Sequence, residues 1–333
     1  MSKKEVLNQL LEHKQGRVPA SFWHHFSAAS GIDLDGYKHP EIIEDNIVKT
    51  KAYVDEINPD FVKLMSDGLF NYDFNQPIDN PTTIYEGIEP IEDDHPWITK
   101  TADLVNRQKQ QIGDRLGFYN IFSPTTLLKW ALTKKPDGTH DKATADGLLI
   151  KAIENDGEAV KKALDVITQD VIKQATAAIN NGADGIYYST QAIQGADHQI
   201  FKEFVEENDR KIFRAVNELS DTNILHICGN RGSRNPLDWF KDYEASVINW
   251  ATDVETTDLK TGKEIFANKV VLGGFGNTVN DILYRGTKEE IENETKRLID
   301  EAGEDRVIIG ANCTVPRDIE IDHLKWAIEG TRK

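Results

Sequence analysis

The chain has 333 residues, of which 39% are hydrophobic and 29% are charged, and its formal net charge is −17 at pH 7. This composition is typical of a soluble globular protein, and the acidic balance disfavours nonspecific binding to nucleic acid or to an anionic membrane. No apolar run is long enough to span a membrane, and two cysteines are too few for a disulfide framework. We therefore expect a cytoplasmic protein with neither nucleic-acid nor membrane partners.

Apolar, β-rich runs bounded by turn residues recur eight times along the chain. These predicted strands cover residues 20–26, 60–66, 117–122, 185–190, 223–228, 246–251, 269–275 and 306–312. Helical periodicity lies between most of them, with the clearest segments at 40–57, 156–181 and 287–302. The last of these opens with a capping-box pattern at Thr287 and Glu290 and stops at Gly303.

Strand–helix alternation over eight units predicts the α/β class and a closed (β/α)8 TIM barrel, with residues 1–333 forming a single domain. An open doubly wound sheet is the alternative, but no Gly-x-Gly-x-x-Gly follows the first strand. Residues 73–94 and 133–144 are rich in turn-forming and charged residues, so we expect them to be loop insertions.

Polar side chains gather at the predicted carboxyl ends of the strands, where barrel enzymes place their active sites. They are His24, His25, Asp67, Ser123, Tyr188, Gln191, His226, Cys228, Asn249, Asp253, Asn277 and Cys313. One of the first two histidines should face the barrel interior, while the other packs under a helix. Asp67 is a candidate general acid or base, although an Asx turn before Gly68 explains it equally well.

His226, Cys228 and Cys313 form the sharpest pattern. The first two lie two residues apart on one strand, so their side chains share a face, and Cys313 follows the last strand. One imidazole and two thiolates are suitable ligands for zinc, with the fourth position open for a substrate. The alternatives are buried core thiols beside an unrelated histidine, or a Cys228–Cys313 disulfide, which a reducing cytoplasm disfavours.

Over nearly its whole length the chain resembles the uroporphyrinogen decarboxylase superfamily. The resemblance is most specific at residues 273–277, at Gly286-Thr287 and at 309–316, and it includes 180–185 before the fourth strand. It implies a (β/α)8 barrel.

The decarboxylases of this superfamily use no metal and hold the substrate carboxylates with arginines after the first strand. Asp67 resembles their central aspartate, but residues 22–31 contain no arginine. Without such bidentate donors an acidic protein has little to offset the desolvation of a polycarboxylate, which disfavours uroporphyrinogen decarboxylation.

The other branch comprises the methylcobamide:coenzyme M methyltransferases, whose zinc motif is His-x-Cys with a distant Cys. His226, Cys228 and Cys313 match it, which implies a zinc-dependent methyltransferase with Asp67 as a possible catalytic group. A small-molecule thiol would bind as a zinc thiolate and take methyl from a methyl-corrinoid on a partner protein. His24, Tyr188, Gln191 and Asn277 are the candidate substrate-binding residues. A uroporphyrinogen decarboxylase and a noncatalytic corrinoid- or tetrapyrrole-binding barrel are the alternative functions.

Overall fold

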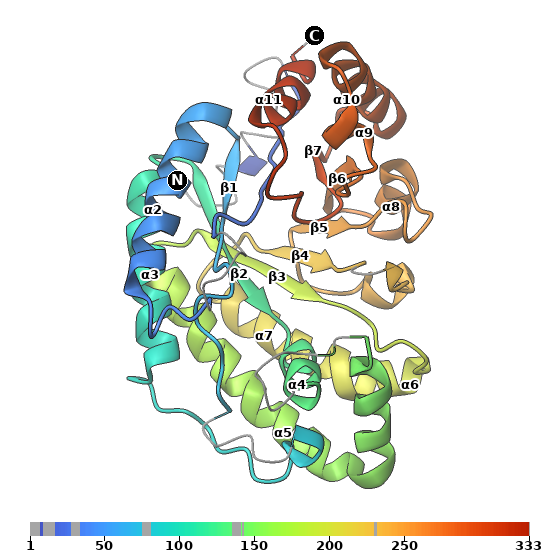
Figure 1. The fold of residues 1–333 in the computed structure, drawn as a ribbon. Helices are drawn as coiled ribbons and strands as arrows, with labels where there is room; N and C mark the ends of the chain where they lie inside the picture. Colours follow the sequence, from blue (N-terminus) through green and yellow to red (C-terminus); the bar gives the residue numbers. More distant parts are fainter. Residues whose placement is uncertain are drawn as a thin grey trace.

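A computed structural model of the chain describes residues 7–8, 17–27, 34–74, 81–134, 141, 143–229 and 232–332. Seven parallel strands follow one another around a curled sheet in sequence order (Figure 1). They are β1 (Phe61–Leu64), β2 (Leu116–Phe122), β3 (Gly185–Thr190), β4 (Ile224–Ile227), β5 (Val247–Trp250), β6 (Val270–Phe275) and β7 (Val307–Ala311). Each corresponds to a predicted strand, and the predicted α/β barrel class is confirmed.

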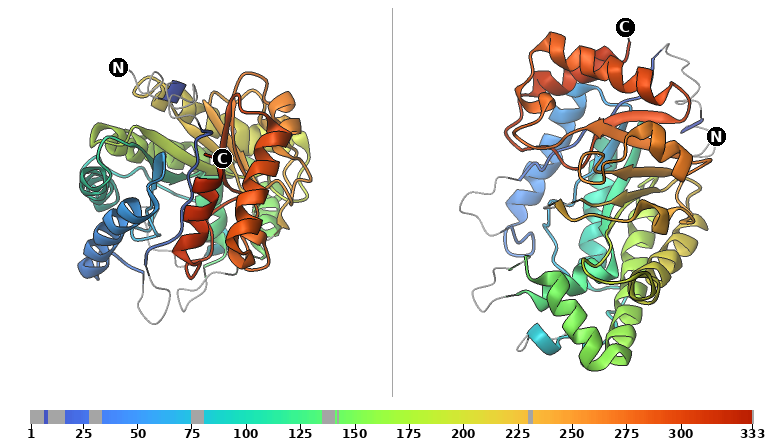
Figure 2. Two further views of the ribbon diagram at one scale, coloured as in Figure 1. Left: turned by 90° about the horizontal axis from the view of Figure 1, so that it is seen from above. Right: turned by 90° about the vertical axis from the view of Figure 1, so that its right-hand side faces the viewer.

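Helices surround the sheet, as the two further views show (Figure 2). The α-helices are α2 (Pro40–Ile57), α3 (Pro96–Gln111), α4 (Pro124–Leu132), α5 (Ala145–Asn180), α6 (His198–Phe201), α7 (Glu207–Asn217), α8 (Leu259–Ile265), α9 (Ile282–Arg285), α10 (Lys288–Ala302) and α11 (Ile321–Gly330). Shorter turns are η1 (Pro81–Thr83), the π-turn η2 (Lys202–Glu206) and η4 (Leu237–Phe240). Among the described residues, none of these helices has the length and apolarity needed to cross a membrane.

The gap between β7 and β1 is closed by the extended segment 19–24. Ser21 N donates to Ile309 O at 3.0 Å, and Ile309 N donates back to Pro19 O at 2.8 Å. On the other side, Asp60 N donates to Ala20 O at 3.1 Å. The segment thus occupies the eighth position of the barrel wall.

A regular strand over 20–26 is nevertheless a wrong prediction, because this segment makes only isolated bridges, at Ala20 and His24. The physical reason is that its backbone N–H groups are missing or already used. Pro19 has no N–H to contribute to a ladder, and Ala20 N donates to the Asp60 carboxylate at 2.7 Å instead of to a strand carbonyl. Backbone pairing with β1 therefore stops after one bond.

Three predicted helix boundaries have clear causes in the structure. Thr287 and Glu290 form the predicted capping box, and α10 ends at Ala302, just before Gly303, whose φ is +72°. The predicted helix start at residue 156 falls inside α5, which begins at Ala145. Asp156 has non-helical φ and ψ, and its side chain accepts a hydrogen bond from Ala159 N at 3.0 Å. The sequence pattern had therefore located a second helix start after a kink. Of the predicted loops, residues 75–80, 135–140 and 142 lie outside the described part of the chain.

Candidate metal centre

A cavity of about 910 Å³ lies over the carboxyl ends of the strands. His226, Cys228 and Cys313 line it together with Asp67, and a large part of its wall is aromatic. These aromatic residues include Tyr72, Phe74, Trp97, Tyr119, Phe122 and Trp130. The predicted mouth of the barrel is thus a roomy pocket with the candidate zinc ligands on its surface.

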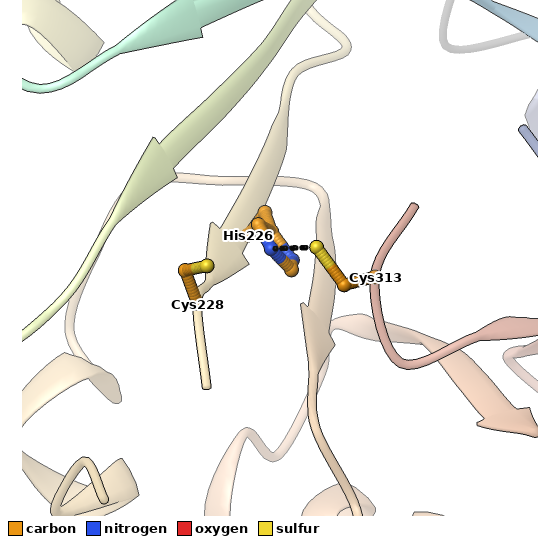
Figure 3. A group of neighbouring side chains, drawn as sticks. All are labelled: His226, Cys228 and Cys313. Atoms are coloured by element: carbon orange, nitrogen blue, oxygen red, sulfur yellow. Dashed lines mark hydrogen bonds between the residues drawn. The ribbon is translucent and has the colours of Figure 1, made fainter. Parts of the chain in front are cut away.

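The three candidate ligands converge on one point. His226 belongs to β4, Cys228 directly follows that strand, and Cys313 follows β7. Their ligand atoms all lie within 4.8 Å of one another, and Cys313 Sγ is 3.3 Å from His226 Nε2. Figure 3 shows the two sulfurs on either side of the imidazole. Ligands of a tetrahedral zinc ion are separated by roughly 3.5–3.8 Å, so small side-chain movements suffice to bind one ion.

Asn249 of β5 fixes the imidazole in the form that zinc requires. Its Nδ2 donates to Leu272 O at 2.8 Å and to Ala311 O at 3.1 Å, which sets the orientation of the amide. Its Oδ1 must therefore accept, and it receives the Tyr187 hydroxyl at 2.7 Å and His226 Nδ1 at 2.6 Å. Because Nδ1 then carries the proton, the lone pair of Nε2 is free and faces Cys313. A hydrogen bond of this kind on the far nitrogen is characteristic of metal-binding histidines.

The thiols have the electrostatic character of metal ligands. Neither forms a disulfide, and neither is fully buried. The pKa of Cys313 is held well below its ordinary value by the hydrogen bond with Cys228; burial opposes this shift, while neighbouring His226 adds to it. A thiolate is the form that binds zinc. The donor set and its hydrogen bonds thus fit the zinc ion that the sequence pattern implies.

Asp67 is a deeply hydrogen-bonded carboxylate on the same cavity. Its Oδ1 lies 3.0 Å from His25 Nδ1. Its Oδ2 accepts from Phe26 N, from the backbone and hydroxyl of Ser27, and from Asn46 Nδ2, at 2.9–3.2 Å. Burial raises the pKa of Asp67, but these hydrogen bonds outweigh it, and the net shift is downward. Such a carboxylate is suited to hold the 25–27 segment and His25 in place rather than to deliver a proton near neutral pH.

Replacing Asp67 by asparagine should destabilise the fold by about 2–4 kcal/mol at pH 7, because an amide group cannot accept all these bonds. A carboxyl group whose folded-state pKa is lowered stabilises the fold above its unfolded-state pKa of about 3.9 and loses that contribution as the pH falls through the folded-state value. The difference between wild type and Asp67→Asn should therefore shrink below about pH 4. Urea unfolding of both proteins at pH 7 and in acid measures it; a difference that stays constant with pH would contradict this account.

The four candidate substrate-binding residues fall into two groups. Gln191 and Asn277 line the cavity, and Asn277 Nδ2 donates to Thr314 O at 3.2 Å, next to Cys313. His24 and Tyr188 lie elsewhere.

His24 packs its ring against Phe26 and against Tyr53 of α2, while His25 lines the cavity. The expected split of this pair, with one histidine inward and one under a helix, is thus seen, but His25 is the inward member. Tyr188 is fully buried outside the cavity, where its hydroxyl donates to Asp209 at 2.5 Å. We therefore leave His24 and Tyr188 out of the proposed substrate site.

Lys63 and Tyr187 had no predicted role, and Asn249 had none beyond its position at a strand end. Lys63 carried a signal, because a lysine inside the apolar run Phe61-Val62-Lys63-Leu64-Met65 is unusual for a buried strand. Tyr187 and Asn249 carried none, since tyrosine is common in strands and the partner of an asparagine depends on its neighbours in space.

Comparison with known proteins places the chain in a family. The family model described as uroporphyrinogen decarboxylase (URO-D) matches residues 73–333. The chain belongs to this family. Two curated relatives of this URO-D family chain are the methylcobamide:CoM methyltransferases MtbA of Methanosarcina acetivorans and Methanosarcina mazei, which are 26% and 25% identical to it over 145 residues. The matched stretch is 43% of this chain and 41% of each relative.

Solved structures support the fold of this URO-D member. A methyltransferase from Methanosarcina mazei superposes with a TM-score of 0.69 at 16% identity, covering 99% of this chain and 98% of the other. A B12-independent methionine synthase from a Shewanella species, in complex with selenomethionine, gives a TM-score of 0.59 at 14% identity and 95% coverage of both chains. At these identities the likeness shows the barrel fold alone.

Proposed function

We propose that this URO-D family protein is a zinc-dependent methyltransferase that moves a methyl group from a methyl-corrinoid, carried by a partner protein, to a small-molecule thiol. The convergence of His226, Cys228 and Cys313 within 4.8 Å on the surface of the cavity carries the proposal. The names of the curated relatives, both methylcobamide:CoM methyltransferases, support it.

His226 Nε2 and the sulfurs of Cys228 and Cys313 would hold the ion, and the cavity would supply the fourth position. When bound, zinc lowers the pKa of an acceptor thiol so that it is present as a thiolate near neutral pH. The acceptor sulfur then attacks the methyl carbon, and the pair of electrons of the cobalt–carbon bond stays on cobalt. The thiol proton is released to solvent.

The surrounding residues would prepare the acceptor. Gln191 and Asn277, both on the cavity wall, are the proposed substrate contacts. The aromatic side chains on the cavity wall lower the local polarity, which strengthens electrostatic interactions at the sulfur. We also propose that residues 1–333 form one barrel domain. Because neither cysteine forms a disulfide, we propose in addition that the protein is cytoplasmic.

The test is methyl transfer by the purified protein. Zinc-loaded protein, methylcobalamin and a panel of small thiols should yield the methyl thioether together with the spectral change of demethylated cobalamin, and protein stripped of metal should yield neither. Absence of transfer to every thiol from free or protein-bound methyl-corrinoid would contradict the proposal. Decarboxylation of uroporphyrinogen by the same preparation would instead establish the alternative that the lack of arginine in residues 22–31 disfavours.

A further inference from the structure

Lys63 is a buried cation on the wall of the proposed thiol site. It lies in β1, is 5% exposed, and lines the same cavity as Cys228 and Cys313. Its Nζ sits 4.0 Å from the centroid of the Tyr187 ring, and that ring stacks on His226 with centroids 5.2 Å apart. The ammonium group is thus held close to the metal ligands by an aromatic ring that contacts both.

Across the described ranges, no acidic oxygen lies within ion-pair distance of Lys63 Nζ. Lys129 is also buried but differs, because its Nζ lies 2.9 Å from Asp146. Burial lowers the pKa of Lys63 to about 8, and the nearby Cys313, Cys228 and Asp67 oppose that shift. A buried cation is costly unless a negative charge offsets it. The cavity offers the two cysteine sulfurs and the Asp67 carboxylate, but that carboxylate is already hydrogen-bonded with His25, Ser27 and Asn46.

The formal charges of the proposed site show at which stage the positive charge of Lys63 matters. Zinc with two cysteine thiolates and a neutral histidine has no net charge. An acceptor thiolate in the fourth position brings the total to −1 in a cavity partly closed to water, where an uncompensated charge is unfavourable. A cation fixed beside the site removes this penalty.

We propose that Lys63 is an electrostatic positioning residue whose ammonium balances the negative charge of the acceptor thiolate, so that it favours binding of the thiol as an anion. The inference rests on the proposed function and deepens it. It assigns to Lys63 a role toward the acceptor sulfur itself rather than toward any acidic group elsewhere on the acceptor. Binding breaks the S–H bond, leaves its electron pair on sulfur and releases the proton to solvent.

The test compares wild type with Lys63→Met and Lys63→Arg. The probe is 2-mercaptoethanol, which has no charge apart from its thiolate. Cobalt(II) is substituted for zinc, and thiol binding is followed by the visible absorption of the metal and by calorimetry. Lys63→Met should bind the probe at least about tenfold more weakly, while its affinity for the metal changes by less than about threefold. Lys63→Arg, which keeps the charge, should recover most of the thiol affinity.

Two controls make the result specific. Lys269→Met removes a half-buried lysine outside the cavity and should leave thiol affinity unchanged. Because methionine replaces an unpaired buried cation with an apolar chain of similar shape, Lys63→Met should unfold at the wild-type temperature or above it.

Equal affinities of wild type and Lys63→Met for 2-mercaptoethanol would overturn the inference. So would a loss confined to 3-mercaptopropionate, since Lys63 would then hold an acidic group of the acceptor. Failure of the wild type to bind any metal would refute the proposed function instead, so the two failures are distinguishable.

Discussion

Cys313→Ser should abolish stoichiometric zinc binding and, with it, thiol methylation. Structural zinc sites bind with about 10–16 kcal/mol shared among four ligands, so the loss of one thiolate should weaken binding by at least about a hundredfold. A serine hydroxyl is a far poorer zinc ligand because it stays protonated at neutral pH. Competition with a chromogenic chelator measures the affinity.

Two further variants separate a ligand role from a packing role. Cys228→Ser should lose zinc to a similar extent, because its sulfur belongs to the same cluster. Cys313→Asp restores an anionic oxygen ligand and should recover part of the zinc affinity, whereas a position needed only for packing would not recover. Unchanged zinc content in Cys313→Ser with a native circular dichroism spectrum would contradict the assigned site.

Asn249→Leu should weaken zinc binding by about 10–100-fold, although Asn249 does not touch the ion. Without the Oδ1 acceptor, the proton of His226 is free to move to Nε2, and the imidazole loses both its tautomer and its orientation. The same substitution leaves Leu272 O, Ala311 O and the Tyr187 hydroxyl without their partner, so the fold should lose about 2–5 kcal/mol. Chelator competition and urea unfolding measure the two effects separately.

Asn223→Leu is the matched control. Asn223 is equally buried and also uses its amide fully, accepting from Ile186 N and donating to Asn217 Oδ1 and Ser220 O, but it precedes β4 at the opposite end from the cavity. Its loss should destabilise the fold without changing zinc affinity. If Asn249→Leu proves too unstable, Tyr187→Phe removes only the second bond to Oδ1 and should change zinc affinity by less than about fivefold. An Asn249→Leu protein that binds zinc as tightly as wild type would refute the tautomer argument.

The fold was predictable because each strand of a barrel is buried on both faces and therefore forms a continuous apolar run. This same burial explains the errors at single residues. Alternation of polar and apolar residues does not distinguish the inner from the outer face when both are buried, so His24 was preferred to His25 and Tyr188 to Tyr187. The predicted strand ends were therefore correct, but each chosen residue is one position away from the residue that faces the barrel interior.

The convergence of the three candidate ligands was predictable for a different reason. A histidine and two cysteines have few roles in common other than metal binding, and parallel strands bring their carboxyl ends to one rim. Residues that act through neighbours have no comparable signature. The proposed role of Asn249 depends on the carbonyls of Leu272 and Ala311, which only the folded chain brings together. Lys63 stood out as a lysine in an apolar run, but its proposed role depends on its contact with the ring of Tyr187.

X-ray absorption at the zinc edge of the purified wild-type protein is the direct test of the proposed site. We expect one zinc per chain with two sulfur ligands at about 2.3 Å and a nitrogen ligand at about 2.0–2.1 Å. Addition of an acceptor thiol should raise the number of sulfur ligands from two to three. Protein that holds no stoichiometric zinc, or a zinc shell that stays at two sulfurs with saturating thiol, would contradict activation of the acceptor as a zinc thiolate.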